Sequence, residues 1–232
     1  MIITAMSDIH GTLIPIDKTD LLLICGDFSP LHIQCNINSM ISWMYDIFIP
    51  YLMNLDAEKI IFIAGNHDFI CAPTYIEHDS LINFRRDVLE EALDTYPNKD
   101  KVEYLEQTMT TYKGLKIYGC PYVEGCRTWA FSNGWNKYND ILPCDILMTH
   151  QPPYIGGLGV VKYSYFEKEL GSIALADKIR EVQPRLVFCG HIHSGNHHPV
   201  TLNFKNKSTT LYNVSIKDED YVVNYPITRV EI

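Results

Sequence analysis

Residues 59–68 read KIIFIAGNHD, an apolar run that ends in a glycine and three polar residues. An apolar run such as 59–64 is typical of a strand that is covered on both faces of a parallel sheet. Gly65 then allows a turn, and residues 66–68 supply an amide, an imidazole and a carboxylate. The stretch therefore predicts an α/β fold with functional side chains at the carboxyl end of a strand.

The same pattern recurs at four other places in the chain. The motifs Asp8-Ile9-His10, Gly26-Asp27, Thr149-His150 and Gly190-His191-Ile192-His193 follow the runs 2–6, 20–25, 145–148 and 185–189. Each motif alone is weak, because such residues are common in turns. Five of them in order at strand ends indicate one site, since parallel strands end at the same edge of a sheet. The glycines before Asp27, Asn66 and His191 are expected to let the backbone turn.

Helices and further strands are expected between these motifs. Apolar periodicity predicts helices over 38–49, 79–93 and 172–182. Pro50 is expected to end or kink the first of them. Strands are expected over 101–109, over 115–118 and, as a closing set, from 201 onward. The segments 11–19 and 119–140 predict loops, the second a long rim loop with room for one helical turn. The simplest account is one α/β domain over 1–232.

The amino-acid composition of the chain limits the kinds of partner that it is expected to bind. The chain has 232 residues, 47% of them hydrophobic, and a net charge of −9 with histidine counted neutral. This charge argues against a general nucleic-acid binder, because such affinity comes from dense Lys and Arg. A phosphate substrate is still possible, since bound cations would reverse the local charge. The chain has no apolar run of the ~20 residues that a membrane span needs. Seven scattered cysteines predict reduced thiols in a cytoplasmic protein.

The order Asp-x-His, Gly-Asp, Gly-Asn-His-Asp, His and Gly-His-x-His resembles the signature of calcineurin-like metallophosphoesterases, over about residues 7–193. Within that superfamily the chain is similar to the branch of metallophosphoesterase-domain-containing proteins. The narrower match is carried by SDIHGT, ICGDFS, IFIAGNHD, GLKIYGCPYV, WAF, MTHQPP, GLG, QPRLVFCGHIHSG and YNVSI. The resemblance implies a four-layer α/β/β/α sandwich of two mixed sheets flanked by helices.

The resemblance also implies two divalent metal ions bridged by Asp27. The other ligands would form two sets, Asp8, His10 and His193 for one ion and Asn66, His150 and His191 for the other. His67 would face the substrate as leaving-group acid or transition-state stabiliser, with Asp68 orienting its ring. A bridging ligand needs two oxygens, which a carboxylate has. Mixed imidazole and carboxylate ligands suit Mn, Fe, Zn or Co better than Mg or Ca.

These residues predict a hydrolase that cleaves phosphate esters with a hydroxide held between two ions. The branch resemblance favours a phosphodiesterase on small nucleotide-like substrates over a phosphomonoesterase. Protein serine/threonine phosphatases of this superfamily continue the Gly-Asp motif with Asp-Arg. In this chain Gly26-Asp27 continues as Phe28-Ser29, so a protein phosphatase is disfavoured. Two alternatives stay open: a non-catalytic interaction scaffold on the same fold, and a nuclease or phosphatase of the same superfamily.

Substrate selectivity is expected to lie in the loops 29–37, 69–80, 119–140 and 151–166. Arg127 could contact a substrate phosphate or be a solvated loop residue. Four aromatic residues could form a wall for a nucleobase or pack in the core: Tyr122, Trp129, Trp135 and Tyr154. The expected partner is a small phosphate ester, with no membrane and with nucleic acid disfavoured. The oligomeric state stays open.

Overall fold

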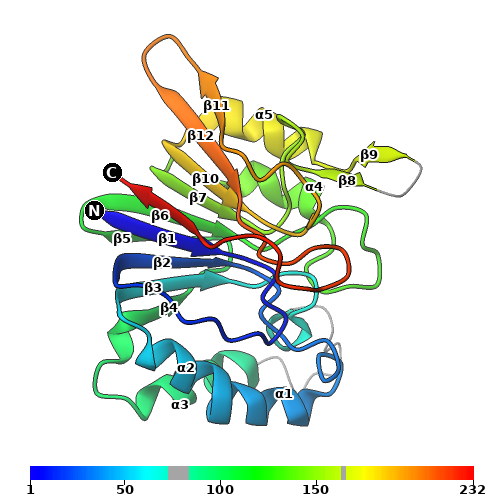
Figure 1. Ribbon diagram of the computed structural model, residues 1–232. Coiled ribbons are helices and arrows are strands. Elements are labelled where there is room, and N and C mark those ends of the chain that lie inside the picture. Colours follow the sequence, from blue (N-terminus) through cyan, green and yellow to red (C-terminus); the bar gives the residue numbers. More distant parts are fainter. Residues whose placement is uncertain (73–83, 163–165) are drawn as a thin grey trace.

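A computed structural model describes residues 1–72, 84–162 and 166–232, in which two large β-sheets are stacked on each other (Figure 1). Within these residues the first sheet has five strands in the order β13-β1-β2-β3-β4. They span Thr228–Glu231, Ile2–Met6, Thr19–Cys25, Ala57–Ile63 and Val102–Tyr104. Strands β1 to β4 are parallel, and β13 pairs with β1 in the antiparallel sense.

The second sheet has six described strands in the order β11-β12-β10-β7-β6-β5. They span Val200–Asn203, Ser208–Asn213, Leu186–Cys189, Ile146–Thr149, Leu115–Cys120 and Thr108–Tyr112. The four central strands, β12, β10, β7 and β6, are parallel. A small antiparallel pair, β8 (Val160–Lys162) and β9 (Glu167–Glu169), lies apart from both sheets.

Helices cover the outer face of each sheet, so the layers run α/β/β/α as predicted (Figure 1). The first sheet is covered by α1 (Ile37–Trp43), a π-helical turn (Met44–Phe48), α2 (Ile49–Asn54) and α3 (Phe84–Asp94). The second is covered by α4 (Gly134–Lys137) and α5 (Ile173–Val182). Short 3-10 turns lie at Phe69–Cys71, Lys99–Lys101 and Tyr138–Asp140. The predicted start of the second helix, 79–83, lies outside the described residues.

The apolar strands are continuous because both of their faces are covered. Leu21 and Leu23 of β2 face the second sheet and share one core cluster with Phe188 of β10. Leu22 and Ile24 point the other way, into a cluster with Phe48 under the helices. Burial on both faces therefore removes the polar alternation that a half-exposed strand would show.

Two expectations are corrected. The predicted strand 101–109 is two strands, β4 and β5, which belong to different sheets. The chain crosses between the sheets at 105–107, where Gln107 has a left-handed backbone with φ of 50°. Of the two outcomes expected at Pro50, the helix end is wrong, because helical residues continue to Asn54. The helix is instead distorted just before the proline, where Met44–Phe48 form a π-helical turn. No described helix combines the length and apolarity that a membrane crossing requires.

Candidate functional site

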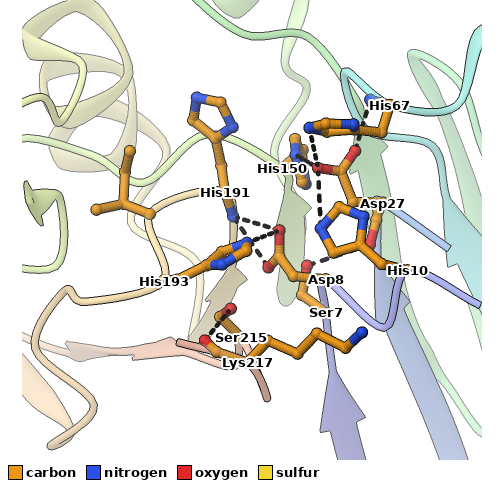
Figure 2. A network of polar contacts seen from close by, with 12 residues as sticks. Ser7, Asp8, His10, Asp27, His67, His150, His191, His193, Ser215 and Lys217 are labelled. Carbon is orange, nitrogen blue, oxygen red and sulfur yellow. Dashed lines mark hydrogen bonds and ion pairs between the residues drawn. The ribbon is translucent and has the colours of Figure 1, made fainter. Parts of the chain in front are cut away.

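The five motifs meet at the carboxyl ends of β1, β2, β3, β7 and β10. Their side chains gather in one buried cluster, which Figure 2 shows from close by. Two groups of three form within it, with ligand atoms within 4.8 Å of one another in each group. They are Asp8, His10 and His193, and Asp27, His150 and His191. The structure thus brings together residues up to 185 positions apart, from Asp8 to His193.

Asp27 belongs to the second group and also reaches the first. Its Oδ2 is 3.2 Å from His150 Nε2 and 3.9 Å from His10 Nε2. The side-chain oxygen of Asn66 is 3.1 Å from the same His150 nitrogen. One carboxylate oxygen therefore reaches both groups, which is what a bridging ligand has to do. We propose that the six residues of the two groups and Asn66 bind metal ions, and this geometry supports the proposal.

The surroundings of the His10 ring indicate whether the cluster suits metal ions. Both ring nitrogens of His10 are buried and have no hydrogen-bond partner among the described residues. An unpaired buried polar group costs about 1–3 kcal/mol. Burial also lowers the pKa of His10 to about 4 and that of His191 to about 3, so both rings are neutral at pH 7. Neutral imidazoles with a free nitrogen are good ligands, and the donor set fits divalent transition metals.

Two other histidines of the cluster, His150 and His193, form ion pairs with carboxylates when no metal is bound. Burial acts to lower the pKa of His150, but Asp27 outweighs it and raises the value to about 9. Burial likewise opposes protonation of His193, yet Asp8, whose Oδ1 is 3.4 Å from Nε2, raises its pKa to about 9. Burial disfavours ionised Asp27 too, but the His150 ring holds the pKa of this carboxyl well below its usual range. Within each pair, the histidine and the aspartate therefore stabilise each other's charged form.

Backbone carbonyls orient these same rings. His150 Nδ1 is 2.8 Å from the carbonyl oxygen of Cys25, and His193 Nδ1 is 2.7 Å from that of Asp218. Each contact leaves Nε2 as the nitrogen that faces the carboxylates. This arrangement is typical of metal-binding histidines, whose second nitrogen is fixed by an outer partner.

The backbone at the site is strained. Asp8, His10, Asp27 and His191 have φ values of 57°, 42°, 53° and 68°. Residues other than glycine rarely adopt this left-handed region, and such strain clusters at functional sites. The turns allow side chains that are close in sequence to point into the same cluster.

Of the three glycines that were predicted to let the backbone turn, Gly26 has that role and the other two have a different one. Gly26 does turn with a positive φ of 96°. Gly65 and Gly190 have ordinary φ values, but neither position has room for a side chain. A Cβ at Gly65 would collide with Asp27 Oδ1 and the His150 ring, and one at Gly190 with Ser7 and Asp8. Gly65 and Gly190 are therefore needed because other side chains of the site pack closely against their backbone, and not because the chain turns there.

The expected pairing of Asp68 with His67 is wrong. His67 Nδ1 lies 2.6 Å from Gln34 Oε1 instead. The buried Asp68 carboxylate accepts three backbone N–H groups at 2.9 Å or less, from Gly65, Asp27 and Ser29. Burial, and then the charge of Asp27, raise the pKa of Asp68 to about 7. Asp68 therefore holds the loops that carry the site and does not touch the His67 ring.

Sequence reasoning missed two residues near the site. Gln34 lies 33 positions before His67, in a loop with no motif of its own. Tyr221 follows the acidic run 218–220, and its ring lies against those of His10 and His193. Gln34 lies in the loop 29–37, where selectivity was expected, but Tyr221 lies outside all four of the predicted loops.

The aromatic and basic residues that were considered for the rim of the site lie in three different places: at the site, in the core and on the exposed surface. The ring of Trp129 lies 4.4 Å from that of His67, between centroids. Tyr122 is 8% exposed and packs on Phe131, so it belongs to the core. Trp135, Tyr154 and Arg127 are exposed, with no contact to a candidate ligand among the described residues.

Comparison with known proteins agrees with the fold and the motifs. The family model described as calcineurin-like phosphoesterase matches residues 1–195. The chain is 27% identical over 252 residues to metallophosphoesterase domain-containing protein 1 of Homo sapiens and of Mus musculus. Each match covers 97% of this chain and 71% of the relative.

Solved structures share the fold at low identity. The protein TT1561 of Thermus thermophilus has a TM-score of 0.55 and 16% identity, covering 93% of this chain and 90% of that one. Phosphopantetheinyl hydrolase from Mycobacterium tuberculosis has the same TM-score of 0.55 and 16% identity, with 94% and 90% covered. The shared fold and the family model over 1–195 lead to one conclusion: this chain belongs to the calcineurin-like phosphoesterase family.

Proposed function

We propose that this chain is a phosphodiesterase that uses two divalent transition-metal ions to hydrolyse small, nucleotide-like phosphate esters. The observation that carries the proposal is the position of Asp27, whose Oδ2 reaches His150 and His10, one from each donor group. The unpartnered ring of His10 supports it, because a metal ion would satisfy that ring. Mn, Fe, Zn or Co suits this donor set.

The residues of the chain have distinct parts in this proposal. Ions bound at the cluster would supply Lewis acidity and lower the pKa of a water. Asp8 and Asp27 offset only part of the charge of two dications, so phosphate meets a positive site despite the net charge of −9. Asn66 adds a ligand without adding negative charge. His67 presents Nε2 toward the cluster, 3.9 Å from Asp27 Oδ2. Because its Nδ1 donates to the Gln34 carbonyl, His67 can give a proton from Nε2 to the leaving group only as the imidazolium. Burial lowers the pKa of His67, and the negative charge of a bound phosphate ester would favour the imidazolium.

The test starts from metal-free protein reloaded with each of the four metals. Hydrolysis of bis(p-nitrophenyl) phosphate is expected to depend on added metal and to exceed that of p-nitrophenyl phosphate. Metal analysis is expected to find two ions per chain. No turnover of either ester with any of the metals would refute the hydrolase. Less than one ion per chain would favour a non-catalytic scaffold.

Gln34→Leu is expected to lower kcat about tenfold while leaving KM nearly unchanged. The Gln34 carbonyl accepts from His67 Nδ1 at 2.6 Å, so its loss frees the ring to rotate away from the leaving group. The effect should be larger for a diester with a poor alkyl leaving group than for a p-nitrophenyl ester, which needs less protonation. Steady-state kinetics on both esters give the comparison. Equal losses on both would contradict a role for His67 as acid.

Metal binding at pH 7.5 is expected to release about two protons per chain from histidine ligands, and a further one where a water bound at the ions would ionise. The raised pKa values of about 9 keep His150 and His193 protonated in the metal-free protein, and each must lose its proton to become a ligand. As pH rises from 7 toward 9, the affinity at each site should therefore increase about tenfold per unit. Calorimetry in buffers of different ionisation enthalpy counts the protons. His198→Ala, at an exposed histidine, should leave the count unchanged.

A further inference from the structure

Trp129 forms one apolar side of the site. It is 37% exposed, and its ring contacts His67 at 4.4 Å and Phe69 at 5.7 Å between centroids. The loop that carries it is tied to the cluster, because the N–H of Ala130 donates to the carbonyl of Asn66 at 3.2 Å. The position of Trp129 is thus coupled to that of a candidate metal ligand.

Tyr221 forms a second apolar side. It is 39% exposed, and its ring stands nearly perpendicular to those of His10, His193 and His67, at 5.0, 5.3 and 6.4 Å between centroids. Its φ of 60° is left-handed, as at four of the candidate ligands. Tyr221 lies beyond residues 1–195, which match the family model.

The turn that presents Tyr221 is held against the metal motif. The carbonyl of Asp218 accepts from Tyr221 N–H at 2.9 Å and contacts His193 Nδ1 at 2.7 Å. Glu219 Oε1 accepts from Ser194 N–H at 2.9 Å. A strained tyrosine on a turn fixed by a candidate ligand is positioned rather than simply solvated. Val222 and Val223 continue the exposed apolar surface, at 59% and 46%.

We infer that Trp129 and Tyr221 bind a planar aromatic ring carried by the phosphate ester. The inference deepens the proposed function and rests on it. The His67 ring lies near both, 4.4 Å from that of Trp129 and 6.4 Å from that of Tyr221 between centroids, so a phosphate at the metal cluster would place its substituent beside them. Large aromatic side chains that are over a third exposed lose water-facing apolar area when such a ring stacks on them. The preferred substrates are then aryl or nucleoside esters, and aliphatic esters are disfavoured.

The experiment compares two non-hydrolysable probes on manganese-loaded protein. Phenylphosphonate and methylphosphonate carry the same phosphonate and differ in the ring, and calorimetry measures their affinities without any turnover. The wild-type chain is expected to bind phenylphosphonate about tenfold more tightly, a modest value for stacking on aromatic side chains. Trp129→Ala and Tyr221→Ala should each weaken phenylphosphonate about threefold and leave methylphosphonate unchanged.

Four further variants sharpen the result. Trp129→Phe and Tyr221→Phe keep a ring and should retain most of the preference, which guards against misfolded alanine variants. Trp135→Ala and Tyr154→Ala remove exposed aromatic side chains, 61% and 51% exposed, that have no described contact with the cluster, and should change nothing. Equal losses for both probes, no preference in the wild type, or no binding of either probe would overturn the inference. A ring preference without ester hydrolysis would refute the proposed function alone, and hydrolysis without a ring preference would refute this inference alone.

Discussion

Asp27→Ala is expected to lower metal-dependent diester hydrolysis by about a thousandfold or more, because a shared ligand supports the charge of both ions and several kcal/mol of transition-state stabilisation depend on them. Asp27 Oδ2 reaches His150 and His10, and no other carboxylate among the described residues is within ion-pair distance of both. Its Oδ1 also accepts from the N–H of His67 at 2.8 Å. Kinetics with bis(p-nitrophenyl) phosphate and metal analysis measure the two consequences, and bound metal should fall below two ions per chain.

Asp27→Asn separates charge from shape. It keeps an oxygen for the His67 N–H but lacks the second oxygen and the negative charge, so activity should remain low while the fold is retained. Asp17→Ala is the matched control, since Asp17 is an exposed aspartate in the loop after the first motif. It should behave as wild type. Two ions per chain and near-normal kcat in Asp27→Ala would show that the carboxylate is not a bridging ligand.

The strands that carry the motifs were predictable for a physical reason. Runs such as 59–64 are covered on both faces, so hydrophobic continuity marks them and the first polar residue marks their end. Ser172 was predictable as a helix start as well, and its Oγ accepts from Leu175 N–H at 3.0 Å. Local patterns therefore predict the element ends, and shared sheet edges predict that the motifs meet.

Contacts between loops were not predictable in this way. Nothing in the sequence pairs Gln34 with His67, because both lie in irregular segments whose paths depend on the whole fold. Asp68 follows His67 directly and looks like its partner, but the backbone there turns the carboxylate toward the N–H of Gly65 in its own motif and the N–H of Asp27 in the second motif. The break within 101–109 was hidden as well, since a residue such as Leu105 is buried between the sheets and looks like part of a strand.

Asp68→Ala is expected to destabilise the protein by about 3 kcal/mol or more near pH 4, where the raised pKa of Asp68 keeps the carboxyl protonated and the cost of its buried charge is small. It removes the acceptor for the N–H groups of Gly65, Asp27 and Ser29, which are buried, and each unsatisfied donor costs about 1–3 kcal/mol. For a chain of this size the loss lowers Tm by about 6–12 °C. Thermal unfolding of metal-free protein measures it without any contribution from bound ions.

Two variants identify the cause of that loss. Asp68→Asn keeps one acceptor oxygen, so it should fall between alanine and wild type. Asp145→Ala removes a single bond, from the N–H of Lys116 at 2.8 Å near the surface, and should cost about 1 kcal/mol or less. If Asp68→Ala instead lowered kcat with Tm unchanged, its carboxylate would act on His67 after all. The expected pattern, a large loss of stability in Asp68→Ala and a smaller one in Asp68→Asn, would show that Asp68 joins the second and third motifs through their backbone N–H groups.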